Sequence, residues 1–148
     1  MTVRIGVLNG PNLNLLGTRE PEHYGTLTLA EIERRIGQVA DEASAEIECF
    51  QSNDEGTLVD WVQARAPSID GWLVNAAALT HTSVALRDAI QASGRPFVEV
   101  HLSNVYAREP FRHTSLLADL AIGVIAGFRV DSYVFGLRAL IGHLQAAE

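Results

Sequence analysis

The sequence contains no lysine, although it has eleven basic residues, all of them arginine. Without a lysine amine, the chain cannot form a Schiff base with a carbonyl substrate, anchor pyridoxal phosphate or supply the lysine of a phosphate-binding P-loop. Its permanently cationic side chains are all guanidinium groups, which stay protonated and bind carboxylates through paired hydrogen bonds. This absence excludes three classes of site and leaves arginine as the residue available to bind an anion.

Cysteine and long apolar runs are also scarce. The single cysteine, Cys49, cannot form an internal disulfide, which fits a reducing cytoplasm, and its place in the run IECF indicates a buried hydrophobe rather than a reactive thiol. No apolar run approaches the ~18 residues of a membrane helix, and the N-terminal MTVRIGVLNG lacks a secretory signal pattern. We therefore expect a cytoplasmic protein that does not bind membranes.

The rest of the composition is typical of one globular domain. Of the 148 residues, 47% are hydrophobic and 20% are charged, and no repeat, linker or low-complexity segment interrupts them. The net charge of −7 argues against a nucleic-acid partner, because phosphate binding usually needs a basic surface. We expect a single domain over residues 1–148.

Short apolar runs alternate along the chain with segments of helical pattern. The expected strands cover residues 3–8, 46–51, 71–75, 97–102 and 120–125. The expected helices cover residues 28–43, 82–93 and 132–146, with one more between a cap at Asn53 or Asp54 and Pro67. Thr28 and Glu31 form a capping box. Strands joined by helical crossovers predict an α/β fold, with a flavodoxin-like, doubly wound, five-stranded parallel sheet of order 2-1-3-4-5 and helices on both faces.

Ligands of such sheets bind at the carboxyl ends of the strands, where the first polar segment is NGPNLNLLGTREPEHYG, residues 9–25. This is a long loop with three glycines and two prolines, a kind of segment that often carries function and can close as a lid. It lacks the glycine pattern of a dinucleotide site and the hydroxyl-rich pattern of a flavin phosphate site. Its polar candidates are Asn12, Arg19, Glu20, His23 and Tyr24. Taken alone, it fits a solvated surface loop equally well.

The second polar segment is NAAALTHTS, residues 75–83. Thr80 or Thr82 can cap the next helix, whose free amides favour an anion, and His81 is expected at the start of that helix. A histidine there is more often solvated or capping than catalytic. No metal site is expected, because metal-ligand spacing is absent among the five histidines, which are His23, His81, His101, His113 and His143.

The third polar segment is VEVHLSNVYAREPFR, residues 98–112. Glu99 and His101 are two apart on a strand, so both side chains point to the same face. A carboxylate that accepts from one ring nitrogen fixes the histidine tautomer and stabilises its cation, which makes His101 a plausible proton donor. A structural hydrogen-bonded pair is the alternative. Arg108 and Arg112 are four apart and would share one face of a helix, where they could bind a small organic acid.

Together these segments resemble the type II 3-dehydroquinate dehydratases over essentially the whole chain. The family motifs N-G-P-N-L-N-x-L-G and R-x-P-x-x-Y-G are similar to residues 9–17 and 19–25. Q-S-N-x-E-G, T-H-T-S and H-[IL]-S-N-x-x-x-R-E-x-F-R are similar to residues 51–56, 80–83 and 101–112, and SYVFG at residues 132–136 also fits. The chain differs at Ala76 and Ala77, where many relatives carry Pro-Gly or Pro-Ala.

The resemblance implies dehydration of 3-dehydroquinate to 3-dehydroshikimate in the shikimate pathway of aromatic amino acid biosynthesis, by anti elimination through an enolate without metal or organic cofactor. It implies that Tyr24, as tyrosinate, is the base and that His101, held by Glu99, is the acid. Asn12 would position the water that stabilises the enolate, and Arg19 and Arg108 would lie near Tyr24.

The resemblance also implies how the substrate is held. Its carboxylate would contact Asn75 and the backbone amides of Leu102 and Ser103, while His81 and Arg112 would take ring hydroxyls. Asp88 would reach the site of a neighbouring subunit, because the family assembles as a dodecamer, a tetramer of trimers.

Three other interpretations were open. A response-regulator receiver needs acidic residues and a lysine, but Asn9 and Asn75 end the relevant strands and lysine is absent. A flavin-binding electron carrier needs a phosphate loop that residues 9–25 do not provide. A non-catalytic small-organic-acid sensor on the same fold is the remaining alternative, and only a measurement of activity separates it from an enzyme.

Overall fold

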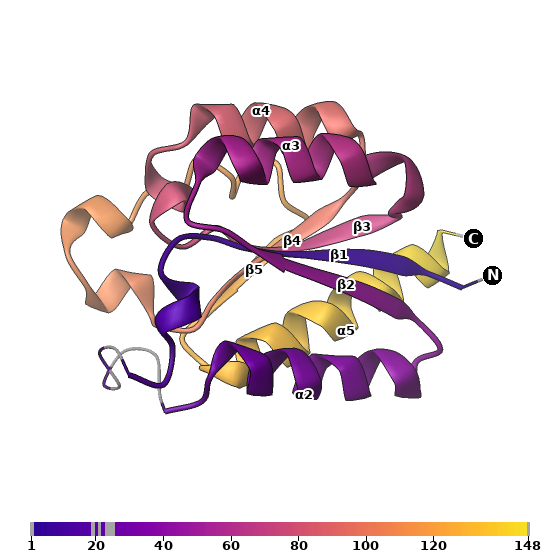
Figure 1. Cartoon of the computed structure of the whole chain (residues 1–148), viewed down its shortest axis with the longest axis horizontal. Coiled ribbons are helices and arrows are strands. Elements are labelled where there is room, and N and C mark those ends of the chain that lie inside the picture. Colours follow the sequence, from indigo (N-terminus) through magenta and orange to yellow (C-terminus); the bar gives the residue numbers. More distant parts are fainter. Residues whose placement is uncertain (1, 19, 21, 23–25, 148) are drawn as a thin grey trace.

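Five parallel strands in the order β2-β1-β3-β4-β5 form the central sheet of the computed structural model, which describes residues 2–18, 20, 22 and 26–147 (Figure 1). The strands are β1 (Arg4–Asn9), β2 (Glu46–Gln51), β3 (Gly71–Asn75), β4 (Phe97–His101) and β5 (Gly123–Ala126). Every neighbouring pair is parallel. The predicted α/β class and the strand order 2-1-3-4-5 are therefore confirmed.

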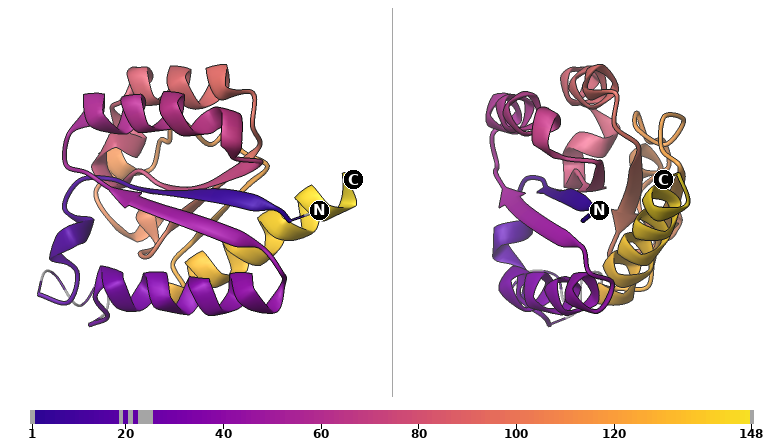
Figure 2. Two further views of the ribbon diagram at one scale, coloured as in Figure 1. Left: turned by 45° about the vertical axis from the view of Figure 1, so that its right-hand side comes forward. Right: turned by 90° about the vertical axis from the view of Figure 1, so that its right-hand side faces the viewer.

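Two pairs of helices cover the sheet, one pair on each face (Figures 1 and 2). One face carries α2 (Leu29–Glu42) and α5 (Val130–Ala146), and the other carries α3 (Glu55–Arg65) and α4 (Val84–Ser93). Within the described part of the chain, no helix combines the length and apolarity that a membrane crossing requires.

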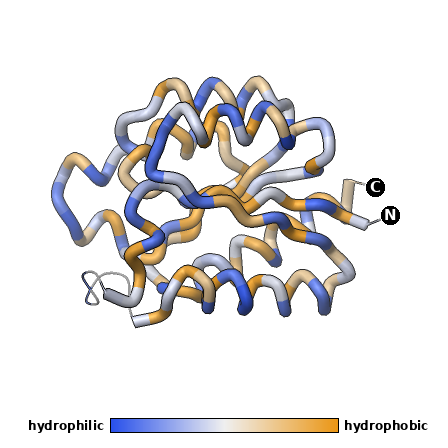
Figure 3. Tube along the Cα trace, in the orientation of Figure 1, coloured by the Kyte–Doolittle hydropathy of each residue, from blue (hydrophilic) through white to orange (hydrophobic). Residues whose placement is uncertain are grey.

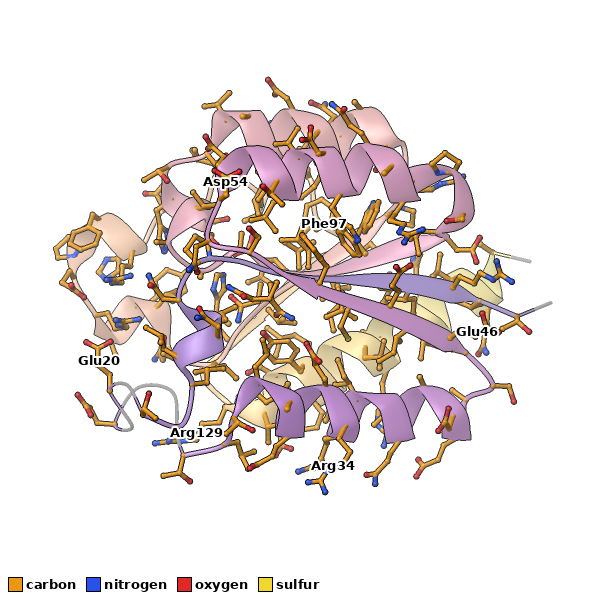
Figure 4. The ribbon with its side chains drawn as sticks, in the orientation of Figure 1. Glu20, Arg34, Glu46, Asp54, Phe97 and Arg129 are labelled. Atoms are coloured by element: carbon orange, nitrogen blue, oxygen red, sulfur yellow. The ribbon has the colours of Figure 1, made fainter. Side chains whose placement is uncertain are left out.

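The core is divided by the sheet into two apolar layers. Along β1, Ile5 and Val7 pack against α2 and α5, whereas Leu8 packs against α3 and α4, as the alternation of side chains along a strand requires. The central strands are accordingly the most hydrophobic part of the trace (Figure 3). Charged side chains such as Arg34 and Glu46 project outward, whereas Phe97 lies between the sheet and the α3–α4 layer (Figure 4).

Helix starts depend on local capping. Thr28 caps α2 by accepting from the backbone amide of Glu31 at 3.2 Å, as expected from the sequence. For α3 the cap is Asp54 rather than Asn53, since Asp54 Oδ2 accepts from the amide of Thr57 at 2.8 Å. These two caps determine the residues at which α2 and α3 begin.

Two boundaries near the C-terminal end differ from expectation. The last strand begins at Gly123, not at residue 120, because its pairing with β4 places Gly123 opposite Val98, while Leu120 packs into the α3–α4 layer. Helix α5 begins at Val130 rather than at Ser132 or Tyr133. The hydroxyl of Ser132 instead accepts from the amide of Phe128 at 3.0 Å and closes the turn before the helix.

Candidate active site

A cavity of about 210 Å³ opens at the carboxyl ends of β1, β3 and β4. Four short 3-10 helices contribute to its wall: η1 (Leu13–Leu15), η3 (Ala77–His81), η4 (Val105–Ala107) and η5 (Pro110–Arg112). Its lining residues are Pro11, Asn12, Leu13, Asn75, Ala77, Ala78, His81, His101, Leu102, Ser103, Val105, Arg108 and Arg112. All three polar segments singled out in the sequence therefore contribute to one cavity.

Glu99 and His101 form a buried pair at the end of β4. Nε2 of His101 lies 2.5 Å from Oε2 of Glu99, and the two residues are 6% and 1% exposed. With Nε2 occupied by the carboxylate, Nδ1 is the ring nitrogen left to hold or deliver a proton. His101 lines the cavity, while Glu99 lies behind it.

Ser115 holds the other oxygen of that carboxylate. Its Oγ donates to Oε1 of Glu99 at 2.7 Å and accepts from the amides of Leu117 and Ala118, each at 3.0 Å. Two incoming donors polarise the hydroxyl and strengthen the bond that it gives. The sequence offered no signal for Ser115, because its contact with β4 depends on the path of the chain after residue 113 rather than on any local spacing.

His81 stands beside His101, with the two rings stacked at 6.4 Å between centroids. Nδ1 of His81 lies 2.8 Å from the carbonyl of Thr114 and donates to it, which leaves Nε2 free for a ligand. Burial lowers the pKa of His81; the bond to the Thr114 carbonyl opposes this, and the neighbouring His101 and Arg112 lower the pKa further. The lowered pKa favours the neutral form of His81 at physiological pH.

The expected place of His81 at the start of α4 is wrong. His81 ends η3, and α4 is capped by Ser83, whose Oγ accepts from the amide of Leu86 at 2.9 Å. Neither Thr80 nor Thr82 caps the helix. Thr80 is fully buried, and the hydroxyl of Thr82 lies 3.5 Å from the carbonyl of Ala78.

Arg108 and Arg112 both line the cavity, but they do not share one helix as expected. Arg108 follows η4, whereas Arg112 ends a separate turn, η5 (Pro110–Arg112), that begins after Glu109. Nη1 of Arg108 lies 3.4 Å from Oγ of Ser103, and Nε of Arg112 donates to Oε1 of Glu109 at 3.0 Å. The two guanidinium groups bring positive charge to a cavity in an otherwise acidic protein.

The segment after β2 explains how the first loop is held. Asn12 has a left-handed backbone (φ 69°), and its amide donates to Oδ1 of Asn53 at 2.9 Å. Nε2 of Gln51 donates to the same Oδ1 at 3.2 Å and to the carbonyl of Gly10 at 3.1 Å. The QSN stretch thus fixes Asn12 at the cavity, a structural role that the motif alone did not indicate.

Asn75 closes the cavity floor and is only 4% exposed. Its Nδ2 donates to the hydroxyl of Tyr133 at 2.9 Å, and its Oδ1 accepts from the amide of Ala77 at 3.2 Å. Ala77 has φ 52°, a left-handed conformation that costs an alanine about 1 kcal/mol or more. The Asn75–Ala77 turn is therefore formed here without the glycine that such a conformation favours.

The remaining predicted residues divide into three groups. Leu102 and Ser103 line the cavity as expected. Asp88 is exposed on α4 and is not among the lining residues. Arg19, His23 and Tyr24 lie outside the described residues. Within the described part of the chain, no three His, Cys, Asp or Glu side chains are grouped to hold a metal ion.

This arrangement can bind and protonate a small acid. Guanidinium groups and amide N–H groups bind oxyanions, a neutral imidazole binds hydroxyls, and a second imidazole backed by a buried carboxylate delivers a proton. The cavity is large enough for one ring-sized molecule.

The sequence is similar throughout to proteins of known type. The family model described as dehydroquinase class II matches residues 3–141. A 3-dehydroquinate dehydratase from Geotalea daltonii is 57% identical over 143 residues, which cover 97% of this chain and 99% of that protein. One from Prochlorococcus marinus is 54% identical over 146 residues, 99% of each chain. The crystal structure of a type II dehydroquinase from Butyrivibrio crossotus matches with a TM-score of 0.91 at 38% identity, covering 94% of this chain and 97% of that one.

Proposed function

The chain belongs to the class II dehydroquinase family, and from this premise we propose that it removes water from 3-dehydroquinate to give 3-dehydroshikimate, a step of the shikimate pathway. As a member of that family it is a hydro-lyase. The proton next to the ketone and the tertiary hydroxyl leave by anti elimination, through an enolate. The reaction is assigned to side chains alone, with no metal or organic cofactor.

The observation that carries the proposal is the pairing of His101 with Glu99 at the cavity wall, 2.5 Å between Nε2 and Oε2. The carboxylate keeps Nε2 engaged and stabilises the imidazolium, so the proton on Nδ1 is the one available to the departing hydroxyl. A hydroxide is a poor leaving group, and protonation as it departs is what makes this bond break at neutral pH.

Tyr24 is assigned as the base, although it lies outside the described residues. A tyrosine with an ordinary pKa of ~10 is a poor base at pH 7, and lowering that pKa by two to three units requires roughly 3 to 4 kcal/mol in favour of the anion. A guanidinium within a few ångströms supplies about 1 to 3 units. Arg108 lines the cavity, and Arg19 lies five residues before Tyr24, so arginine is available for this task.

The substrate is assigned to the cavity by its three kinds of polar group. Its carboxylate binds to Asn75 and to the backbone amides of Leu102 and Ser103. Its ring hydroxyls bind to His81 and Arg112. Nδ1 of His81 is engaged by the Thr114 carbonyl, so Nε2 is the ring nitrogen that meets the hydroxyl, and the lowered pKa favours the neutral ring. Asn12, whose backbone is held by Asn53, positions the water that stabilises the enolate.

The proposal extends to assembly and location. We assign a dodecameric assembly, a tetramer of trimers, in the cytoplasm. Asp88, which is exposed on α4 and outside its own cavity, is the residue assigned to a neighbouring subunit's site. Analytical ultracentrifugation tests the assembly directly, since a monomer at micromolar concentration contradicts it.

The test of the reaction is an absorbance assay. Purified protein is mixed with 3-dehydroquinate in the presence of a chelator, and the ultraviolet absorbance of the conjugated enone product is followed. We expect a rise with wild-type protein and none with Tyr24→Phe, whose ligand binding by calorimetry stays close to wild type. Folded wild-type protein without activity would support the sensor alternative, and loss of binding in step with turnover in Tyr24→Phe would contradict the base assignment.

A further inference from the structure

A buried chain of hydrogen bonds behind the cavity joins side chains of β1, β3 and α5. Tyr133, which is fully buried, donates its phenolic proton to Oδ1 of Asn9 at 2.6 Å and accepts from Nδ2 of Asn75 at 2.9 Å. Of the three, only Asn75 lines the cavity. Tyr133, from the stretch SYVFG, therefore affects the cavity through its hydrogen bond to Asn75.

The backbone amide of Ala77 determines the donor and acceptor of each hydrogen bond in this buried series. The N–H of Ala77 can only donate, and it lies 3.2 Å from Oδ1 of Asn75. The amide of Asn75 must therefore present its oxygen to Ala77 and its nitrogen to Tyr133. Because a phenol has one proton, Tyr133 accepts from Asn75 and gives that proton to Asn9.

The side chain of Asn9 contributes only its oxygen to these hydrogen bonds. The residue is 0% exposed, and its Nδ2 has no hydrogen-bond partner among the described residues. A buried amide nitrogen without a partner costs free energy, which the hydrogen bond made by the oxygen of the same amide offsets in part. Here that oxygen is the acceptor that orients the hydroxyl of Tyr133. Burial also raises the pKa of Tyr133 above its usual range, so the phenol keeps its proton and this orientation.

The consequence for the cavity concerns the second proton of Asn75. Nδ2 carries two protons, and Tyr133 takes one of them, so the other is the donor that Asn75 can offer to a ligand. If the side-chain amide of Asn75 were rotated by 180°, its oxygen would face the ligand and repel a carboxylate. We propose that Tyr133, together with Asn9, is a positioning residue that holds Asn75 as a donor and so selects a carboxylate at this point of the cavity. The inference rests on the proposed function, which supplies the identity of the acid.

The test compares Tyr133→Phe with a control that loses a different internal hydrogen bond. Phenylalanine fills the same space but leaves Asn75 Nδ2 without an acceptor, so the amide is held only by Ala77. The control is Ser93→Ala, which removes the bond that Nε1 of Trp72 donates to Ser93 Oγ at 3.0 Å, away from the cavity lining. We expect Tyr133→Phe to raise KM for 3-dehydroquinate ~10-fold with kcat within about 3-fold of wild type, the loss typical of one hydrogen bond to a charged group. Ser93→Ala should keep the wild-type KM.

The proposal is overturned by a folded Tyr133→Phe with wild-type KM, or by an equal rise of KM in Ser93→Ala. Should Tyr133→Phe fail to fold, Asn9→Ala replaces it, because it removes the acceptor of the phenolic proton; an unchanged KM there also overturns the proposal. If wild-type protein does not turn over 3-dehydroquinate, that result contradicts the proposed function but does not test the positioning role of Tyr133. The comparison is then made by calorimetric binding of quinate, the ring carboxylic acid with a hydroxyl in place of the ketone, and equal affinities of wild type and variant overturn the positioning role.

Discussion

The hydroxyl of Ser115 lies 2.7 Å from Oε1 of Glu99, on the carboxylate whose other oxygen faces His101 at 2.5 Å. Both oxygens of this buried carboxylate are thus engaged by side chains 16 and two residues away in the sequence. The orientation of His101 depends on this arrangement, because a carboxylate held at one oxygen only can rotate away from the ring.

We expect Ser115→Ala to lower kcat by about 10-fold, the equivalent of ~1.4 kcal/mol lost from one hydrogen bond to a charged group. Steady-state kinetics checks this, and circular dichroism reports whether the fold is kept. Ser115→Thr retains the hydroxyl and should recover most of the rate. An alanine variant as active as wild type would show that Glu99 is held without Ser115.

For His101→Asn we expect a loss of about 10²- to 10⁴-fold in kcat, the usual contribution of a general acid. Asparagine is too short to reach Glu99 from this position, but the carboxylate keeps its hydrogen bond from Ser115 at 2.7 Å, so we expect the fold to be retained with reduced stability. Turnover and thermal unfolding are measured on the same preparation. Near-normal rates would remove His101 as the acid.

Replacing Ala77 by glycine should stabilise the protein by about 0.5 to 1 kcal/mol. Ala77 has φ 52°, so relief of left-handed strain exceeds the entropy that glycine adds to the unfolded chain. Urea unfolding of both proteins measures the difference. A matched control is Ala92→Gly within α4, where glycine should destabilise by a similar amount. Equal losses at both positions would mean that the backbone at Ala77 is not strained.

Cys49 should react slowly with thiol reagents in the native state. Burial, reinforced by the charges of Glu33 and Glu48, raises the pKa of this thiol to about 12. At pH 8 its thiolate fraction is then on the order of 10³-fold below that of an ordinary cysteine. A chromogenic disulfide reagent added with and without denaturant measures the ratio, and rapid native labelling would contradict it. Because the folded pKa is the higher one, the group also disfavours the native state above about pH 8.5.

The pH dependence of stability should carry a contribution from His81. Its pKa is lowered in the folded state by burial, so the unfolded chain binds more protons as pH falls through about 6.5. Stability therefore decreases over that window in wild type and decreases less in His81→Gln. Denaturant unfolding between about pH 7.5 and 5.5 compares the two slopes, and parallel curves would show that His81 titrates alike in both states.

Much of this architecture follows from short-range rules in the sequence. The cap at Thr28 depends on one hydroxyl and an amide three residues later, and the shared direction of Glu99 and His101 depends on the two-residue period of a strand. Alternating strands and helices leave few topologies, which is why the sheet order could be predicted. The cap and the shared direction of the two side chains are each decided within a few residues, whereas the sheet order follows from the alternation of elements along the chain.

The features that were missed depend on long-range contacts. Asn53 meets the amide of Asn12 across 41 residues, and no local period marks such a pair. The start of β5 was misplaced because residues 120–126 form a continuous apolar run, in which only pairing with β4 selects the register. Arg108 and Arg112 were expected to share one face of a helix, but they lie at the ends of two separate turns because Pro110 divides the segment.

The bond between Asn9 and Tyr133 also has a consequence for biosynthesis. The two residues are 124 positions apart, so Tyr133 leaves the ribosome long after Asn9. Asn75 can adopt its final orientation only once α5 has been made and has docked on the sheet. A nascent chain can therefore pair β1, β2 and β3 early, yet the cavity is not finished until α5 has been made. A ligand cannot stabilise the partly folded chain before the cavity is complete. The intermediates formed earlier must therefore be stable without ligand.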